Sequence, residues 1–458
     1  MQIDNEALKS AAQKILLDCL ALRDGSEIAI IFDETTSNIV NFIIDAALDL
    51  HIIPLPVFYP KRFQGLWKHN YLPKAIEPVI ENVTAVMLCV VGAQDYLAFR
   101  TLLRQTAQNS MRQVAHMPGI DVETMLMADI DYEKMRKDCE LLAAALVKGR
   151  HVKIITSGKF NGKVEEYELN IPLDPFGRMP IISDGYIQRG AWGNVPSGET
   201  YIAPQEGRLW GEIVINGSVP GYPLAEGEAI LLSFKDGILD DWWPKESPAI
   251  QHLFERHIDI ARNNGDTNWS VLAELGIGVN EKVTRLTGNP LLDEKMKGSI
   301  HIALGRNKDM GGNNASEIHC DLVTIPISVE INQEQIITNG KLSLNSGVLL
   351  GDWNSSSVVP NLSNASIEIT SKEGRKPNGE LRRYWDAGSG RLCSIPVGEG
   401  EISLAAARVY EFCKNNGGRI DVNSLLEDRR FNLEREKMLQ VISILVEYQL
   451  VNVVNGEV

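Results

Sequence analysis

Short, continuously apolar segments that alternate with helical patterns are the feature of this sequence that most constrains its fold. Residues 27–33 (EIAIIFD) and 84–92 (TAVMLCVVG) are apolar runs of strand length, whereas residues 37–50 carry isoleucine, alanine and leucine at helical spacing. Strands of this kind, separated by helices, predict a parallel sheet with both faces covered. We therefore expect an α/β domain over residues 1–137, in which residues 94–116 form a long helix. No Gly-rich phosphate-binding motif follows these strands, so a nucleotide cofactor is not expected.

From about residue 138 the sequence changes to many short β-like runs separated by Gly, Pro, Asn and Asp, such as KVEEYELNI and GEIVINGSV. This pattern predicts a β-rich α+β domain over residues 138–372. Residues 373–389 are polar, charged and contain glycine and proline, so we expect a linker there. Residues 390–458 follow with helical patterns, a turn and a terminal hairpin, an order that resembles a winged-helix-like domain.

Charge and cysteine usage disfavour several classes of protein. The 458 residues carry a formal net charge of −15, which argues against a nucleic-acid or anionic-membrane surface. Residues 404–458 hold seven Lys and Arg against eight Asp and Glu, so the C-terminal domain is expected to contact protein rather than DNA. No apolar run reaches the roughly 20 residues needed to cross a bilayer. With six scattered cysteines, these features favour a cytoplasmic protein without a membrane or nucleic-acid partner.

Two histidines and an aspartate point to a metal site. His319 and Asp321 are separated by one residue in EIHCDLVTI, and in a strand such residues point to the same face. His301 lies in a second strand-like run, SIHIALG, and the Gly/Asn-rich segment between the runs can fold back. Imidazole nitrogens and carboxylate oxygens suit Zn, Co, Mn or Fe(II). An isolated His-x-Asp pair is equally compatible with ordinary hydrogen bonding, so both interpretations stay open.

Two glutamates extend this set. Glu274 lies in the apolar segment LAELGIGVN, where an unpaired carboxylate would be costly, and Glu199 opens an apolar run after a Pro/Gly turn. Each by itself is also compatible with a cap or a salt bridge. With both glutamates the set suffices for two ions about 3.5–4 Å apart. Without them, His301, His319 and Asp321 form the facial triad of a mononuclear Fe(II) oxygenase.

The order of these motifs resembles the thermophilic aminopeptidase T family of metallo-aminopeptidases. The resemblance is carried by Gly-Glu followed by Ala-Pro, Ala-Glu-Leu-Gly-Ile-Gly, Asp-Glu, His-x-Ala-Leu-Gly and Ile-His-x-Asp. It implies an α/β domain followed by a metal-bearing domain, a homodimer, and two divalent ions of Zn, Co or Mn. Glu294 matches an acidic pair before the ligand histidine and is implied as a proton-transfer residue. By position, the implied metal ligands are Glu199, Glu274, His301, His319 and Asp321.

Two departures separate this chain from that family. The family has a tyrosine seven residues after the first ligand histidine, where this chain has Lys308. Lys308, or the adjacent Asn307, is then expected to take the catalytic role of the phenol. The C-terminal winged-helix-like domain is the second departure. The resemblance extends to 2,5-dihydroxypyridine 5,6-dioxygenases, which use mononuclear iron, and the missing tyrosine is compatible with that chemistry.

Three functions follow from this sequence, in order of preference. The first is a metal-dependent aminopeptidase-like hydrolase that cleaves an N-terminal residue from a short peptide or aminoacyl amide through metal-activated water. The second is a mononuclear Fe(II) ring-cleaving dioxygenase of the 2,5-dihydroxypyridine dioxygenase type. The third is a non-enzymatic binding protein that recruits a partner through residues 390–458. In either enzyme the expected partner is a small peptide or small-molecule substrate.

Overall fold

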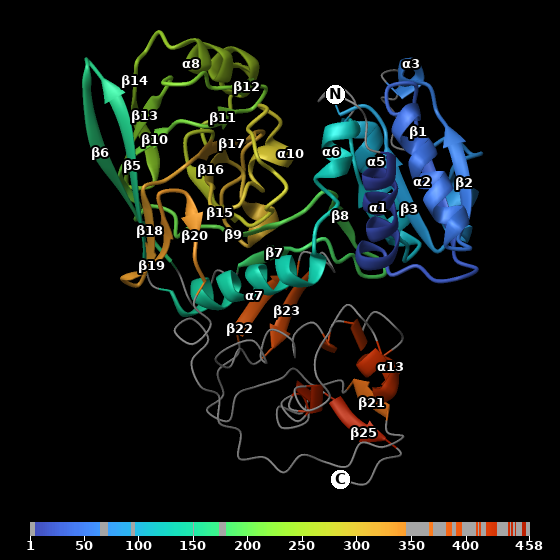
Figure 1. The fold of residues 1–458 in the computed structure, drawn as a ribbon. Helices are drawn as coiled ribbons and strands as arrows, with labels where there is room; N and C mark the ends of the chain where they lie inside the picture. Colours follow the sequence, from blue (N-terminus) through green and yellow to red (C-terminus); the bar gives the residue numbers. More distant parts are fainter. Residues whose placement is uncertain are drawn as a thin grey trace.

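The computed structural model describes most of residues 5–344 and short segments beyond them (Figure 1). The described ranges are 5–64, 72–92, 97–149, 151–173, 180–344, 366–369, 382–386, 391–395, 409–410, 412–413, 418–427, 438–439, 441–442, 445 and 451–454. In Figure 1 a parallel sheet with its helices forms one lobe, two further β-sheets form the other, and α7 runs along the lower side of the β-rich lobe toward the first.

The N-terminal lobe contains the parallel sheet expected from the sequence. Its strand order is β2-β1-β3-β4-β8, and every neighbouring pair is parallel. The strands are β1 (Glu27–Phe32), β2 (Ile53–Phe58), β3 (Ala85–Cys89), β4 (Gln113–His116) and β8 (Trp192–Asn194). Alternate side chains of β1 enter two separate hydrophobic clusters, one containing Ile28 and Ile30 and the other Ala29 and Ile31. Continuous apolar strands therefore arise because both faces of the sheet are buried.

Helices cover both faces of this sheet. The first cluster includes buried side chains of α1 (Asn5–Lys14) and α2 (Ser37–Asp49), which pack against each other. The second cluster includes those of α4 (Glu77–Asn82) and α5 (Leu97–Asn109). Burial of one stripe of each helix against β1 and β3 fixes the lobe.

The long helix expected over residues 94–116 is confirmed for Leu97–Asn109 and wrong for Gln113–His116. Helix α5 ends at Asn109, the backbone turns through Met111 at a φ of 59°, and Gln113–His116 forms β4. All four residues of β4 are buried, and the strand pairs with β3 on one side and β8 on the other. Pairing with a strand on each side outweighs the weak local preference for helix.

Most of the remaining described strands form two large, mainly antiparallel sheets, as the β-rich pattern predicted. The first has the order β14 (Ile238–Trp243), β13 (Ile230–Lys235), β10 (Trp210–Ile215), β6 (Lys163–Pro172), β5 (His151–Phe160), β18 (Ser328–Ile331), β19 (Glu334–Thr338) and β20 (Lys341–Leu342). The second has the order β12 (Tyr222–Pro223), β11 (Ser218–Val219), β17 (His319–Thr324), β16 (Ile300–Gly305), β15 (Leu272–Gly278), β9 (Glu199–Ile202), β7 (Ile181–Ser183), β22 (Arg382–Asp386) and β23 (Arg391–Ile395).

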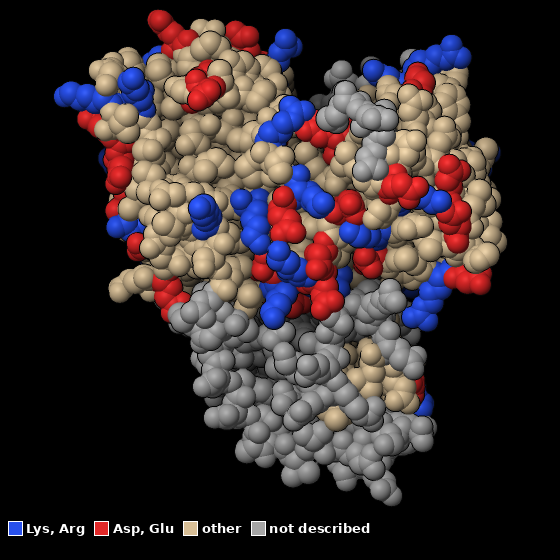
Figure 2. Space-filling view, viewed as in Figure 1, with Lys and Arg blue, Asp and Glu red and all other residues tan. Residues whose placement is uncertain are grey.

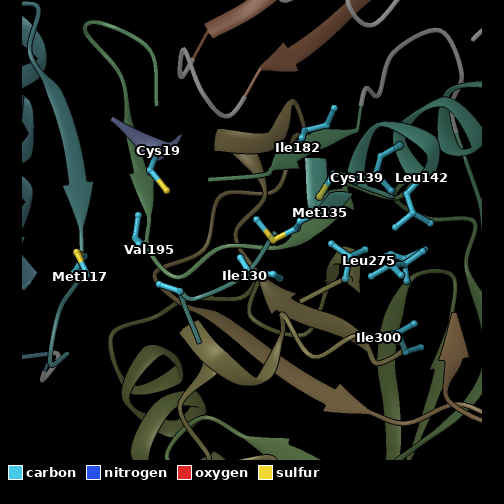
Figure 3. Close-up of a cluster of buried hydrophobic side chains, with 14 of the residues drawn as sticks. Cys19, Met117, Ile130, Met135, Cys139, Leu142, Ile182, Val195, Leu275 and Ile300 are labelled. Carbon is cyan, nitrogen blue, oxygen red and sulfur yellow. The ribbon is translucent and has the colours of Figure 1, made fainter. Parts of the chain in front are cut away.

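Helix α7 (Tyr132–Lys148) joins the lobes. The Asp131 carboxylate caps it by accepting from the Lys134 amide, as N-caps do. Its buried face, including Cys139 and Leu142, belongs to the same cluster as Leu275 of β15 (Figure 3). Apolar side chains of the second β-sheet therefore point toward α7 and the shared core, which leaves the opposite face of that sheet for polar groups.

Strand pairing crosses the domain boundaries expected from the sequence. β8 follows residue 138 yet completes the N-terminal sheet, and β22 lies within residues 373–389 yet pairs with β7. β21 (Ser366–Ile369) pairs with β24 (Arg419–Asp421) and β25 (Val451–Val454), and α13 (Val422–Glu427) follows β24. Most residues of the expected winged-helix-like domain lie outside the described residues, so that domain stays a prediction.

The described surface carries both signs of charge. Figure 2 shows Lys and Arg side chains interspersed with Asp and Glu, densest near α7, where Lys134 pairs with Glu281 and Lys297 with Asp138. Within the described ranges, none of the helices combines the length and apolar character needed to span a bilayer. The cysteine side chains described are free and buried, namely Cys19, Cys89, Cys139, Cys320 and Cys413.

A buried ion pair ties α7 to the segment after β7, and it gives a test of the packing. Arg136 Nε lies 3.2 Å from Asp184 Oδ2, with the two side chains 8% and 5% exposed. Arg136→Met should lower the free energy of unfolding by about 3–5 kcal/mol, because it leaves a buried charge without its partner. Lys134→Met removes an exposed pair on the same helix and should cost less than about 1 kcal/mol. Urea unfolding measures both; equal losses would contradict this account.

Candidate metal centre

The candidate site lies on one face of the second β-sheet, across β9, β15, β16 and β17. These four strands are adjacent and antiparallel. Because strand residues alternate between faces, Leu275, Ile302 and Cys320 enter the hydrophobic core. Glu274 and His319 lie one position away, on the opposite face. The predicted shared face of His319 and Asp321, with Cys320 directed away, is thus observed.

Small residues on this face make room for the ligand side chains. His301 is the cross-strand partner of Gly276, and a Cβ atom at Gly276 would lie 1.9 Å from Cε1 of His301. A Cβ at Gly278 would lie 2.2 Å from the Met296 carbonyl oxygen. Ala303 separates Glu274 from Asp321, because it is the cross-strand partner of both. The pattern AELGIG therefore places one carboxylate beside two positions that other chain segments cover.

The segment DEK is buried, although a charged cluster of this kind is ordinarily exposed. It begins at the last residue of α10 (Pro290–Asp293), and Asp293, Glu294 and Lys295 are 0%, 8% and 0% exposed. The Asp293 carboxylate accepts hydrogen bonds from the amides of Thr287 and Gly288, at 2.8 and 2.7 Å. These bonds hold the turn that delivers Glu294 and Lys295 to the site.

One group of potential ligands consists of Glu274, His319 and Asp321. His319 Nδ1 donates to the Arg306 carbonyl oxygen at 2.7 Å, which directs Nε2 toward the site. That nitrogen lies 2.9 Å from Glu274 Oε2 and 3.3 Å from Asp321 Oδ1. The His319 and Asp321 side chains are 27% and 15% exposed, so solvent reaches this group.

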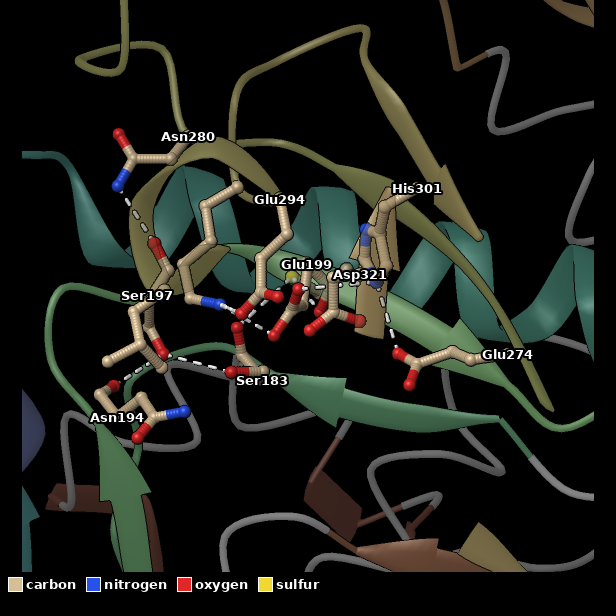
Figure 4. A network of polar contacts seen from close by, with 12 residues as sticks. Ser183, Asn194, Ser197, Glu199, Glu274, Asn280, Glu294, His301 and Asp321 are labelled. Atoms are coloured by element: carbon tan, nitrogen blue, oxygen red, sulfur yellow. Dashed lines mark hydrogen bonds and ion pairs between the residues drawn. The ribbon is translucent and has the colours of Figure 1, made fainter. Parts of the chain in front are cut away.

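A second group consists of Glu199, Glu294 and His301, all of them buried (Figure 4). His301 Nε2 lies 3.9 Å from Glu199 Oε2. Among the described residues, that oxygen has no hydrogen-bond partner. A buried carboxylate oxygen without a partner is costly, and a cation would satisfy it.

Glu274 connects the two groups. Its Oε1 lies 3.1 Å from His301 Nε2, and its Oε2 lies 2.9 Å from His319 Nε2. Within each group the potential ligand atoms lie within 4.8 Å of one another. A carboxylate placed between two imidazoles could serve as a ligand in either group. The mixture of nitrogen and oxygen donors fits a divalent metal such as Zn, Co or Mn.

Lys295 is a member of the site that the sequence reasoning missed. Its Nζ lies 2.8 Å from Glu199 Oε1 and also contacts Glu294 Oε1. Burial lowers the pKa of this ammonium, but the charges of Glu199 and Glu294 outweigh that effect and raise it. The sequence around Lys295 does not reveal that this side chain is buried, because its burial results from the packing of the turn after α10 over Gly278.

The buried charges shift the pKa values of the ligands in opposite directions. Burial raises the pKa of Glu294, and the charge of Glu199 raises it further, to about 8. Burial also raises the pKa of Glu274, but hydrogen bonds from His301 and His319 bring it down to about 2. Burial lowers the pKa of His301, which its hydrogen bond to Glu274 and the nearby carboxylates raise to about 9. Perturbed groups in one cluster are typical of functional sites.

Lys308 and Asn307, the residues expected to replace the absent tyrosine, do not contact the ligand candidates among the described residues. Lys308 is exposed in the short helix Lys308–Met310, and it makes no described contact with the six ligand candidates. Asn307 is buried, but its side chain holds the local loop by donating to Glu206 and accepting from the Asn314 amide. The expectation for Lys308 is therefore unsupported by the geometry.

A tyrosine that the sequence analysis did not single out, Tyr201, lies near the carboxylates of the site. Tyr201 lies two residues after Glu199 in β9, hence on the same face. Burial raises its pKa, and the charges of Glu274, Glu199, Glu294 and Asp321 raise it further. The alternation that paired His319 with Asp321 would have identified Tyr201 as well.

Serine and asparagine side chains link the site to the parallel sheet (Figure 4). Ser183 is the cross-strand partner of Glu199, and its hydroxyl lies 3.1 Å from that of Ser197. Ser197 donates to the Asn194 carbonyl oxygen, and the Asn194 side chain contacts His116 Nδ1 at 2.8 Å. The end of β8 thus fixes the backbone that leads into Glu199.

A methyl group at Gly276 tests whether the strand face positions the metal ligands. Gly276→Ala should displace the His301 ring, whose Nε2 lies 3.1 Å from Glu274 Oε1, and so weaken binding of Zn²⁺ or Co²⁺ at Glu274 by about 10–100-fold, because the orientation of that carboxylate is lost. Isothermal titration calorimetry measures the affinity, and circular dichroism checks the fold. Gly92→Ala is the matched control, since its added Cβ would lie 3.4 Å or more from its neighbours. Unchanged affinity in Gly276→Ala would contradict the assignment.

The pKa shifts predict how metal-free protein responds to pH. The pKa of His301 is raised from 6.5 to about 9, so its contribution to stability is full below pH 6.5 and is lost as the pH rises through 9. Glu294, raised from 4.5 to about 8, acts in the same direction between those values. Glu274, lowered from 4.5 to about 2, contributes fully above pH 4.5. In EDTA, the melting temperature should therefore fall between pH 6.5 and 9, and His301→Gln should flatten that slope. A melting temperature that rises over this interval would contradict the shifts.

Solved structures of other proteins share this fold. One is 2,5-dihydroxypyridine dioxygenase from Pseudomonas putida KT2440, with a TM-score of 0.55 and 14% identity over 75% of this chain and 99% of that chain. Another is wild-type AmpT from Thermus thermophilus, with a TM-score of 0.51 and 14% identity over 74% of this chain and 99% of that chain. No protein-family profile and no curated protein matches the chain. At this identity the likeness establishes a common fold, and the function has to be inferred from the site.

Proposed function

We propose that this protein is a metal-dependent hydrolase that removes the N-terminal residue from a short peptide or aminoacyl amide. The observation that carries the proposal is the division of six buried or half-buried ligands into two groups joined by Glu274. Each group offers one imidazole and two carboxylates. Such oxygen-rich sets suit hydrolytic divalent ions.

Glu274, His319 and Asp321 would hold a divalent ion, which would supply Lewis acidity for activating water and polarising a scissile carbonyl. Glu294 is the candidate for proton transfer, because it is buried next to Glu199 and its pKa is raised to about 8. A carboxyl group with a pKa near the working pH can accept a proton from water and return it to a leaving amine. The carboxylates also favour a substrate with a free, positively charged amino terminus.

The alternative, an Fe(II) ring-cleaving dioxygenase, requires His301, His319 and Asp321 around one ion. In the structure His301 instead groups with Glu199 and Glu294. This arrangement supports the hydrolase, even though an aminopeptidase and a dioxygenase share the fold at equal identity.

Substitutions at the two kinds of site residue should affect activity in different ways. Asp321→Asn should remove bound metal and abolish release of the N-terminal residue from dipeptides and aminoacyl amides. Glu294→Gln should keep the metal but lower kcat by about 10²–10⁴-fold, because it removes proton transfer. Chromatography of the products gives the rates of cleavage. Elemental mass spectrometry of the acid-digested protein gives the metal content.

His151→Ala, at a strand histidine outside the site, is the control and should leave both quantities unchanged. N-acetylated substrates should resist cleavage if the free amine is recognised. Fe(II)-dependent O₂ uptake with an aromatic diol, together with no peptide cleavage by metal-loaded protein, would refute the hydrolase and favour the dioxygenase.

A further inference from the structure

The two ligand groups differ in the positively charged side chains that pair with their carboxylates. Lys295 Nζ lies 2.8 Å from Glu199 Oε1 and contacts Glu294 Oε1, so one oxygen of each carboxylate in this group is engaged by an ammonium. Among the described residues, no Lys or Arg pairs with Glu274 or Asp321, whose ion-pair partners are imidazoles. An internal cation therefore occupies one group and leaves the other for an external ion.

Access to solvent divides the groups in the same way. The Lys295 side chain is 0% exposed, and those of Glu199 and Glu294 are 6% and 10% exposed. His319 and Asp321 are 27% and 15% exposed. A hydrated ion can thus reach the group at Glu274, whereas the group at Glu199 is buried together with the lysine that pairs with it.

Packing makes the ammonium a fixed part of the site. The Lys295 carbonyl oxygen accepts from the Asn280 amide at 2.8 Å, and the backbone of the same turn lies against Gly278. The Asn280 side chain in turn donates to the Ser197 carbonyl oxygen at 2.8 Å. With both ends of the turn held, Nζ is directed into the space between the two glutamates.

We propose that Lys295 is a built-in cation that takes the place of a metal ion at Glu199, Glu294 and His301. The native chain then loads one divalent ion, at Glu274, His319 and Asp321, rather than a pair. This inference rests on the proposed metal centre but not on which reaction that centre performs. It assigns Lys295 a positioning role: the ammonium holds Glu199 and Glu294 in place and sets the number of ions.

Metal counting on the full chain tests the proposal. Protein stripped with EDTA is dialysed against Co²⁺, and the bound metal is measured by elemental mass spectrometry, with the Co²⁺ absorption bands reporting coordination. Lys295→Met should raise the content from about one to about two ions per chain, because the two carboxylates that Lys295 engages are freed to act as ligands together with the His301 imidazole. Adding Glu199→Gln to Lys295→Met should return the content to about one ion.

Two further variants make the result independent of folding defects. Lys295→Gln keeps an N–H donor for Glu199 without the charge, so it should gain the second ion even if Lys295→Met does not fold. Lys297→Met is the matched control, because Lys297 lies in the same segment and pairs with Asp138 at a partly exposed position. It should bind the same amount of Co²⁺ as the native chain.

Each outcome separates this inference from the proposed function. Two ions in the native chain, or one ion in the native chain and in both Lys295 variants, would overturn the role of Lys295 and leave the metal centre standing. No bound Co²⁺ in any variant would overturn the metal centre itself, and the inference with it. A second ion gained by the Lys295 variants and not by Lys297→Met would support the proposal.

Discussion

Burial of several carboxylates against one sheet face is the constraint on which the rest of the site depends. Glu199, Glu274 and Glu294 are 5%, 5% and 8% exposed, and buried carboxylates repel one another unless cations lie between them. The chain supplies part of the compensation through Lys295 and the imidazole of His301. The remaining demand for positive charge is what makes the cluster a candidate for a divalent ion rather than a structural salt-bridge network.

The fold meets this constraint by placing apolar side chains on one face of the sheet and the polar side chains of the site on the other. One face packs its apolar residues against α7 and the other β-sheet, so the strands are held rigidly. The other face intersperses large polar side chains with Gly276, Gly278 and Ala303, over which rings and a neighbouring turn can lie. Rigid strands fix side-chain directions more accurately than loops would, which suits a site whose ligand atoms must converge.

Much of this arrangement could be predicted from local patterns. The continuous apolar runs predicted the parallel sheet, and alternation in EIHCDLVTI predicted that His319 and Asp321 share a face. The same reasoning failed at residues 113–116, where pairing with β3 and β8 overrode a helical pattern. It also failed to identify Lys295, because the residues DEK look the same in the sequence whether they are exposed at the surface or buried in a turn that packs over a glycine.

The sequence by itself determined the strands and the residue types that they carry, because periodicity and side-chain chemistry are local properties. Only the tertiary structure decided which carboxylate accompanies which imidazole. The register of β15 against β16 and β17 brings Glu274 between His301 and His319, and the turn after α10 adds Glu294 and Lys295 to the side of Glu199. Spacing along the chain cannot specify this partition, since cross-strand register and the burial of a charge depend on segments distant in sequence.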